Sequence, residues 1–315
     1  MKITRGYRSG ADRPYPVATI GNFDGHHVGH RSLLRLVVEA ARRRNGTALV
    51  LTFDPHPVKI LAPQAGLRYL TSPDEKLARF EEAGIDEVVL LEFDRAFAAL
   101  SPEAFADEVL ARGLGLKELY VGEHFAFGHK RAGKIGELAA FGRRLGFVVH
   151  PLPPVVVEGV IVSSTRIRRL IQEGDVRQAA TLLGRRYALA GVVSAGAQRG
   201  QSLGWPTANL KLPPDRVVPA DGVYAAITMV DAQRSDSIAY IGTRPTFDAG
   251  ERLLEVNLLD GVRDLYGRTL AVEFVERVRG DLRFAEPEAL SRQIAVDVER
   301  AKAMLRRHHD AAVEP

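Results

Sequence analysis

The sequence contains no cysteine among its 315 residues, and this absence excludes disulfide bonds and zinc sites built on thiolates. It also has no apolar run near the ~18 residues that a membrane-spanning helix needs, and no secretory segment opens it. We therefore expect a protein with no membrane partner and, by default, a cytoplasmic location.

A strong charge of one sign is lacking as well, because 43 Lys and Arg residues stand against 39 Asp and Glu residues, for a net charge of +4. This mild excess suits anionic small molecules such as nucleotides. Basic runs such as 42–44 stand alone, and the aromatic residues are not interleaved with them as a base-stacking surface requires. A nucleic-acid partner is therefore not expected.

What is present is enough for two domains, since 315 residues exceed the usual ~100–200 residues of one domain. The first half alternates apolar runs with amphipathic segments, and this order predicts an α/β fold with a doubly wound parallel sheet. The predicted strands are 16–20, 47–53, 87–91, 118–121 and one from 147, and the predicted helices are 30–44, 72–83, 101–113 and 134–145. Ser72 and Glu75 form a capping box that opens the second of these helices.

The pattern of predicted secondary structure changes after about residue 183, where strands follow one another without helices between them. We expect strands at 186–194, 223–231, 237–241, 253–259 and 270–278, and one long helix at 287–308. This pattern predicts a small antiparallel β-barrel with a C-terminal helix. The predicted domains are residues 1–184 and 185–315.

The stretch GNFDGHHVGH at 21–30 follows the first predicted strand and precedes the first predicted helix. Ligands of a parallel sheet bind beyond the carboxyl ends of its strands, and a helix N-terminus attracts anions. Gly25 and Gly29 let the backbone approach a ligand closely, and His27 and His30 can donate ring N–H bonds to phosphate oxygens. The stretch is interpreted as a phosphate-binding loop.

Two other interpretations stay open at this point. His27 and His30 have the spacing of a metal-binding pair, although a third ligand is not evident nearby. The stretch can also be polar and glycine-rich only because the chain turns there.

Longer strings carry a resemblance to a known family. TIGNFDGHHVGH, TFDPHP, VGEHFAFGHKRAG, VSSTRIR, LGWPTANL and DGVYA span residues 19–224, and RPTF and LLEVNLLD follow them. Together they resemble the bifunctional prokaryotic riboflavin kinase/FMN adenylyltransferase family, or FAD synthetases, whose first domain is a Rossmann-like member of the HxGH nucleotidyltransferase superfamily. The set of strings is specific, whereas any one of them is not.

The resemblance implies that the first domain joins FMN to the α-phosphate of ATP and releases pyrophosphate. The FMN phosphate is already an anion at pH 7, so the reaction needs positioning and charge neutralisation and no general base. The implied catalytic residues are His27, His30 and Arg166, with Arg166 over the leaving pyrophosphate. The implied ATP contacts of this domain are Gly21, Phe23, Gly25, His27, His30, Ser164, Thr165 and Arg166, and the implied flavin contacts are Asp54, His56, Pro57, Phe125 and Arg131.

The resemblance implies that the second domain phosphorylates riboflavin, whose neutral hydroxyl benefits from a general base. Glu255 matches the family's catalytic glutamate, and Thr207 and Asn209 match its PTAN motif, which implies contacts to Mg²⁺ and to the ATP phosphates. From spacing alone, Glu255 and Asn257 equally suit a solvated strand face, and 206–209 equally suits a turn.

Some positions depart from the family pattern. Asn257 replaces a usual His, Tyr240 a usual Asn, and Gln201 a usual Arg, and His124 stands where relatives often carry Asp or Asn. Two rival functions therefore remain. One is an adenylyltransferase, with FMN or another acceptor, whose barrel has no kinase activity; the other is a nucleic-acid-binding protein with an OB-like barrel. The sequence says nothing about oligomeric state.

Overall fold

The structure is a computed structural model that describes residues 1–7, 12–194, 205–231, 233–243, 252–261 and 265–311. Contacts between residues divide the chain into two compact units, Met1–Ser164 and Thr165–Pro315. In the part of the chain that the structure describes, no helix is long and apolar enough to cross a membrane. The domain boundary expected from the sequence, at 184/185, stays a prediction.

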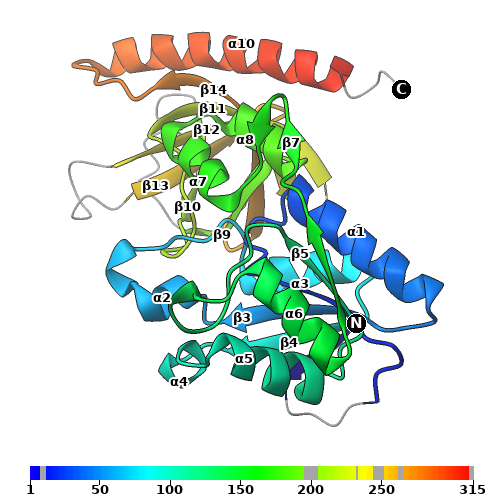
Figure 1. Cartoon of the computed structure of the whole chain (residues 1–315). Helices are drawn as coiled ribbons and strands as arrows, with labels where there is room; N and C mark the ends of the chain where they lie inside the picture. Colours follow the sequence, from blue (N-terminus) through cyan, green and yellow to red (C-terminus); the bar gives the residue numbers. More distant parts are fainter. Residues whose placement is uncertain (8–11, 195–204, 232, 244–251, 262–264, 312–315) are drawn as a thin grey trace. The chain divides into compact units, whose positions relative to one another are not determined.

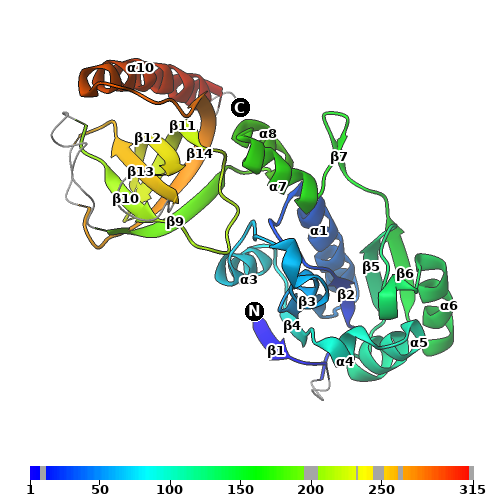
Figure 2. The same cartoon turned by 90° about the vertical axis from the view of Figure 1, so that its left-hand side faces the viewer.

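The first unit is built on a six-stranded sheet with the strand order β1-β4-β3-β2-β5-β6, and its neighbouring strands pair in parallel (Figures 1 and 2). The strands are β1 (Lys2–Arg5), β2 (Val17–Ile20), β3 (Ala48–Asp54), β4 (Glu87–Glu92), β5 (Glu118–Gly122) and β6 (Val148–Leu152). The predicted doubly wound parallel sheet is confirmed. The sequence did not indicate β1, because three of its four residues are polar and it forms only an edge of the sheet.

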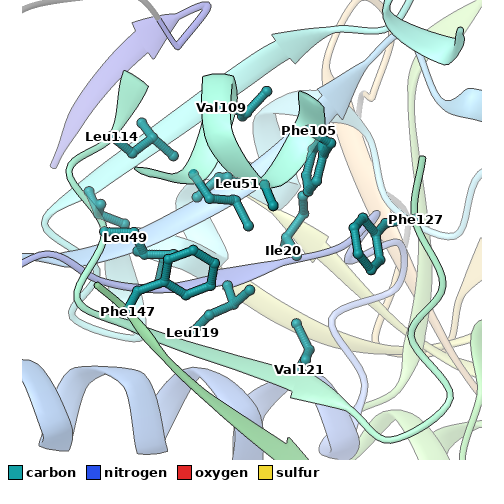
Figure 3. Close-up of a cluster of buried hydrophobic side chains, with 14 of the residues drawn as sticks. Ile20, Leu49, Leu51, Phe105, Val109, Leu114, Leu119, Val121, Phe127 and Phe147 are labelled. Atoms are coloured by element: carbon teal, nitrogen blue, oxygen red, sulfur yellow. The ribbon is translucent and has the colours of Figure 1, made fainter. Parts of the chain in front are cut away.

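Helical segments cover both faces of this sheet. They are α1 (Val28–Arg43), α2 (Pro57–Leu61), η1 (Pro63–Ala65), α3 (Pro73–Glu82), α4 (Arg95–Ala98), α5 (Pro102–Ala104), the π-helical η2 (Phe105–Gly113), η3 (His129–Arg131) and α6 (Ile135–Leu145). One core contains buried residues of α1 and α3 and the other contains residues of η2 and α6. Figure 3 shows the second core, with Ile20, Leu51 and Leu119 from the strands gathered near Phe105 and Val109. The strand ends are therefore the parts of the sheet left for a ligand.

Two features of the first unit explain where its helices begin. The predicted capping box is present at α3, with Ser72 Oγ accepting from the Glu75 N–H and the Glu75 carboxylate accepting from the Ser72 N–H. α1 begins at Val28, earlier than predicted, because His27 acts as its N-cap.

A short hairpin of β7 (Val156–Val157) and β8 (Val160–Ile161) precedes Ser164.

The second unit contains a closed antiparallel barrel with the strand order β10-β13-β12-β11-β14-β9 (Figure 2). Its strands are β9 (Tyr187–Ser194), β10 (Ala208–Lys211), β11 (Gly222–Val230), β12 (Gln233–Thr243), β13 (Arg252–Leu258) and β14 (Thr269–Gly280). Before the barrel come α7 (Ser164–Glu173), whose first residue closes the first unit, and α8 (Val176–Leu183). The predicted barrel is confirmed.

The predicted C-terminal helix is confirmed as α10 (Pro287–Ala311), which lies along one side of the barrel (Figure 1). Its Val298, Ala301 and Leu305 are buried against outward-facing residues of the barrel strands. The prediction missed β10, which has only four residues and begins inside the PTAN motif, where a turn was the alternative interpretation.

Candidate active sites

The stretch 21–30 connects the carboxyl end of β2 to the N-terminus of α1. His27 has extended backbone angles, and its Nδ1 accepts a hydrogen bond from the His30 N–H at 3.2 Å. Gly25 adopts φ +87°, in the left-handed region that favours glycine. The predicted strand–loop–helix arrangement is therefore present, with the loop at the helix N-terminus.

The two predicted histidines lie together. Their rings are stacked with centroids 3.5 Å apart and an interplanar angle of 17°. Because Nδ1 of His27 accepts a hydrogen bond, a proton on the neutral ring must sit on Nε2, which then acts as a donor. One buried imidazole donor thus stands at the positive end of the α1 dipole, an arrangement that suits an anion.

Asp24 and Thr71, which sequence reasoning did not single out, hold this loop in place. The buried Asp24 carboxylate accepts hydrogen bonds from the Leu70 N–H and from both the N–H and the hydroxyl of Thr71, at 3.0–3.2 Å. Thr71 Oγ1 in turn accepts from the Gly25 N–H at 3.1 Å, and Ser164 Oγ donates to the Asp24 carbonyl at 2.8 Å. The only sequence signal was the place of Asp24 inside the motif.

Two of the predicted ATP contacts, Gly21 and Phe23, belong to the sheet and to the core under the loop. The Gly21 N–H donates to the Leu51 carbonyl at 3.0 Å and continues the sheet by one residue. The Phe23 side chain is only 1% exposed and packs edge-on against Phe80 and His30. Its ring belongs to the core under the loop, so any contact of Phe23 with a nucleotide must come from its main chain.

The predicted flavin contacts follow the two strands that flank β2. Asp54 ends β3, and His56 caps α2 by accepting the Val58 N–H on Nδ1 at 3.2 Å, with Pro57 as the first helical residue. Phe125 follows β5 and stacks on Phe127 at 5.8 Å. Arg131 ends η3 and is exposed, as is His124. The structure thus puts both groups at the carboxyl ends of the two strands on either side of β2.

The remaining predicted residue positions of this site follow Ser164 directly along the chain. Thr165 and Arg166 lie in the first turn of α7 and belong to the second unit, where both are exposed. Among the described residues, no group of three or more His, Cys, Asp or Glu side chains is arranged to hold a metal ion.

A second polar group lies on the barrel. In β13, Leu254, Val256 and Leu258 are buried and the residues between them are half-buried, so Glu255 and Asn257 share the outward face, as predicted. The register places Asn209 of β10 opposite Glu255 on one side. Residues directly opposite in antiparallel strands have Cβ atoms about 4.5–5.5 Å apart, so these two side chains are neighbours.

Tyr240 of β12 stands opposite Glu255 on the other side. Its hydroxyl donates to the Asp281 carboxylate at 3.0 Å. Burial, together with the negative charges of Asp281 and Glu255, raises the pKa of Tyr240 above its usual value. Tyr240 therefore stays a neutral donor beside Glu255.

Thr207 is half-buried and comes just before β10. The Asn257 amide donates to the Pro206 carbonyl at 2.7 Å, so the residue that departs from the family pattern ties the PTAN segment to β13. Asn209 is buried at the second position of β10. Gln201 and the string RPTF at 244–247 lie outside the described residues.

Two protein-family models match the chain. The model for FAD synthetase matches residues 11–166, and the model for riboflavin kinase matches residues 183–305. The chain is 38% identical over 300 residues to the bifunctional riboflavin kinase/FMN adenylyltransferase of Escherichia coli K12, covering 94% of this chain and 96% of that protein. It is 39% identical over 289 residues to the protein of the same name from Pseudomonas fluorescens, covering 91% and 92% of the two chains.

Among solved structures, the chain resembles one described as a macrolide-efflux protein from Streptococcus pneumoniae. The TM-score is 0.86 at 31% identity, and the match covers 96% of this chain and 99% of that chain. That description differs from the names of the curated relatives, which agree with both family models.

Proposed function

The chain belongs to the family of bifunctional riboflavin kinases/FMN adenylyltransferases, and from this membership we propose how its residues divide the two reactions. It phosphorylates riboflavin to FMN and adenylylates FMN to FAD, with ATP as a substrate of both steps. The observation that carries the division is that the stacked His27 and His30 lie in one unit while Asn209 and Glu255 lie in the other.

In the first unit, the loop 21–30 binds ATP phosphates. The Nε2 of His27 and the free N–H groups at the start of α1 neutralise charge that develops on the triphosphate. His30 packs on His27 and holds its ring in place. Ser164, already bonded to the loop, supports the site, and Thr165 and Arg166 after it stay predicted ATP contacts.

The flavin is expected to lie after β3 and β5, against Asp54, His56, Pro57, Phe125 and Arg131. Phe125 offers the isoalloxazine ring a half-buried aromatic surface. Since the FMN phosphate attacks as an anion, the unit's task is to align that phosphate with the α-phosphate of ATP.

In the second unit, Glu255 is the general base that accepts the proton of the riboflavin hydroxyl. Asn209 is the neighbour that orients ATP phosphates, and Thr207 lies before the same strand. The side-chain oxygens of Thr207 and Asn209 fit Mg²⁺, which prefers oxygen ligands and retains waters. Bound Mg²⁺ would neutralise charge on the β- and γ-phosphates.

The two rival functions find no support in the comparisons, because both family models match and the curated relatives carry both activities in their names. Riboflavin, FMN, FAD and ATP are the proposed small-molecule partners. The cytoplasmic location and the absence of nucleic-acid and membrane partners stay predictions from the composition.

The test supplies each substrate separately to three proteins: the parent, His27→Ala/His30→Ala and Glu255→Gln. With riboflavin, ATP and Mg²⁺, Glu255→Gln should form FMN about 10²–10⁴-fold more slowly, because it keeps the shape but loses the proton acceptor. With FMN and ATP, the histidine variant should form no FAD while its riboflavin phosphorylation persists. Equal losses of both activities in either variant would contradict the division, and a Glu255→Gln variant at parental rate would make Glu255 an ordinary surface residue.

A further inference from the structure

A lysine that the mechanism above does not use lies beside the phosphate-binding loop. Lys76 of α3 donates from Nζ to Thr52 Oγ1 at 3.3 Å, near the carboxyl end of β3. The Thr52 hydroxyl donates in turn to the Asn22 carbonyl, at 3.4 Å, inside the loop 21–30. Lys76, which lies on α3 and not on α1, is therefore linked to the first residues of the loop through the Thr52 hydroxyl.

The surroundings of Lys76 are those of a partly buried cation. Asp24 of the loop and Asp54 at the end of β3 are the charged groups that face it, and both favour its protonated form. Burial outweighs them, so the pKa of Lys76 lies below its usual value. An additional anion at this place would restore the charged form.

Neither carboxylate needs Lys76 as its partner. Asp24 already accepts hydrogen bonds from two backbone N–H groups and from Thr71, which are enough to satisfy a buried carboxylate. The Asp54 side chain is 61% exposed and lies 3.6 Å from Arg5, so water stabilises its charge. Among the described residues, Thr52 Oγ1 accepts a hydrogen bond from the Lys76 ammonium, which carries three donors.

The reaction assigned to this unit brings a phosphate dianion up to a triphosphate. The loop supplies partial charges, from the α1 dipole and from a histidine whose Nδ1 is an acceptor. Lys76 adds a full positive charge next to the loop, at the carboxyl edge of the sheet.

We propose that Lys76 is a phosphate-binding catalytic residue of FMN adenylylation, whose ammonium donates to an oxygen of the reacting phosphates while Thr52 holds it in place. This inference rests on the proposed adenylylation site in the first unit. The phosphate belongs to FMN or to ATP, and the kinetic constants of the two substrates distinguish these sources.

The experiment compares Lys76→Met and Lys76→Arg with the parent in FAD formation from FMN and ATP. The matched control is Lys117→Met, an exposed lysine of the same unit just before β5, at the opposite end of the sheet. Lys76→Met should lower kcat/KM about 10- to 100-fold, the range of a hydrogen bond to a charged group, while Lys76→Arg retains most of it. A higher KM for FMN alone assigns the FMN phosphate, and a higher KM for ATP alone assigns the triphosphate.

The pH dependence of FAD formation is a second measurement, and a purely structural role of Lys76 would not change it. The parent should lose FAD formation at alkaline pH as Lys76 deprotonates, and Lys76→Arg should lack this loss, because arginine stays charged. The unfolding midpoint and the riboflavin kinase rate of every variant are measured in parallel, so that misfolding is recognised.

Three results would overturn the inference: parental FAD formation by Lys76→Met, an unchanged alkaline limb in Lys76→Arg, or equal losses in both variants accompanied by lower unfolding midpoints. Absence of FAD formation in the parent would instead refute the proposed function. An equal loss in Lys117→Met would show that the effect is not specific to Lys76 and would also overturn the inference.

Discussion

The buried ion pair between Arg13 and Glu87 offers a test of how the first unit is held together. Their side chains are 3% and 4% exposed. The guanidinium donates to both carboxylate oxygens, at 2.7 and 2.9 Å, and the Thr4 hydroxyl donates to the same carboxylate at 2.6 Å. The group joins β1 and β4 to the segment before β2, away from the proposed substrate site at the carboxyl ends of the strands.

Replacing Glu87 with Gln keeps the shape but removes the negative charge that pairs with the buried guanidinium of Arg13. Breaking a buried pair in this way costs about 3–5 kcal/mol of unfolding free energy. For a unit of this size, each kcal/mol lowers the midpoint by about 2–4 °C, so we expect a fall of about 6–20 °C. Glu92→Gln, an exposed position at the end of the same strand, is the control and should change little.

The chain carries its own internal reference for this assay. Trp205 is the single tryptophan, and its indole N–H donates to Ser291 Oγ in the second unit. In Glu87→Gln, the temperature at which FAD formation is lost should fall, while the midpoint followed by Trp205 fluorescence and the riboflavin kinase rate stay at the parental values.

The pH dependence gives a second readout. Burial alone would raise the pKa of Glu87, but the hydrogen bonds from Arg13 and Thr4 lower it below the usual value. A carboxyl whose folded pKa is depressed contributes stability above its unfolded pKa, about 4.3, and that contribution is lost as the pH falls through the folded pKa. The variant should therefore lack part of the parent's acid-induced loss of stability.

The reasoning fails if Glu87→Gln costs less than about 1 kcal/mol, the scale of an exposed pair. It also fails if Arg13→Met/Glu87→Leu, which removes both charges, is no more stable than the single variant, because a pair replaced by apolar residues should recover most of the loss.

Two further predictions concern the sites. Asn257→Ala removes the hydrogen bond to the Pro206 carbonyl and should slow riboflavin phosphorylation about 2- to 13-fold, the equivalent of one neutral hydrogen bond. FAD formation from FMN should be unchanged. An equal loss in both assays would show that the bond only supports folding. Gly25→Ala should lower the unfolding free energy by about 1–2 kcal/mol, because the φ of Gly25 is +87°, and should abolish FAD formation. Gly66→Ala, at an exposed glycine with φ +58°, should cause similar strain and keep FAD formation. Similar activities in the two variants would contradict a role for the shape of the loop 21–30.

Local signals predicted most of the fold because they act over a few residues. The capping box at Ser72 and Glu75 needs only its own four residues, and the alternation in β13 follows from the period of a strand. Elements too short for a pattern were missed. β1 and β10 have four residues each and are recognised as strands only by the partners beside them, β4 and β13.

The support of the first site could not be predicted for a different reason. Asp24 reaches residues 70 and 71, and Lys76 reaches Thr52, so the contacts join segments that are distant in the chain and are brought together only by the packing of α3 against the sheet. In the sequence, Lys76 is one charged residue of an amphipathic helix, a pattern that is typical of a solvated face.

A motif therefore marks a place more reliably than it assigns a role to each letter. In TIGNFDGHHVGH, Phe23 is part of the core, Asp24 fixes the loop to residues 70 and 71, and His27 caps a helix and presents Nε2 as a donor. These three residues share one string because the proposed function needs a packed floor, a fixed loop shape and a ligand-binding group at once. Burial and hydrogen bonding separate the roles, and they predict that Asp24→Asn impairs FAD formation through the shape of the loop, with lowered stability, whereas loss of the His27 ring impairs it with the fold intact.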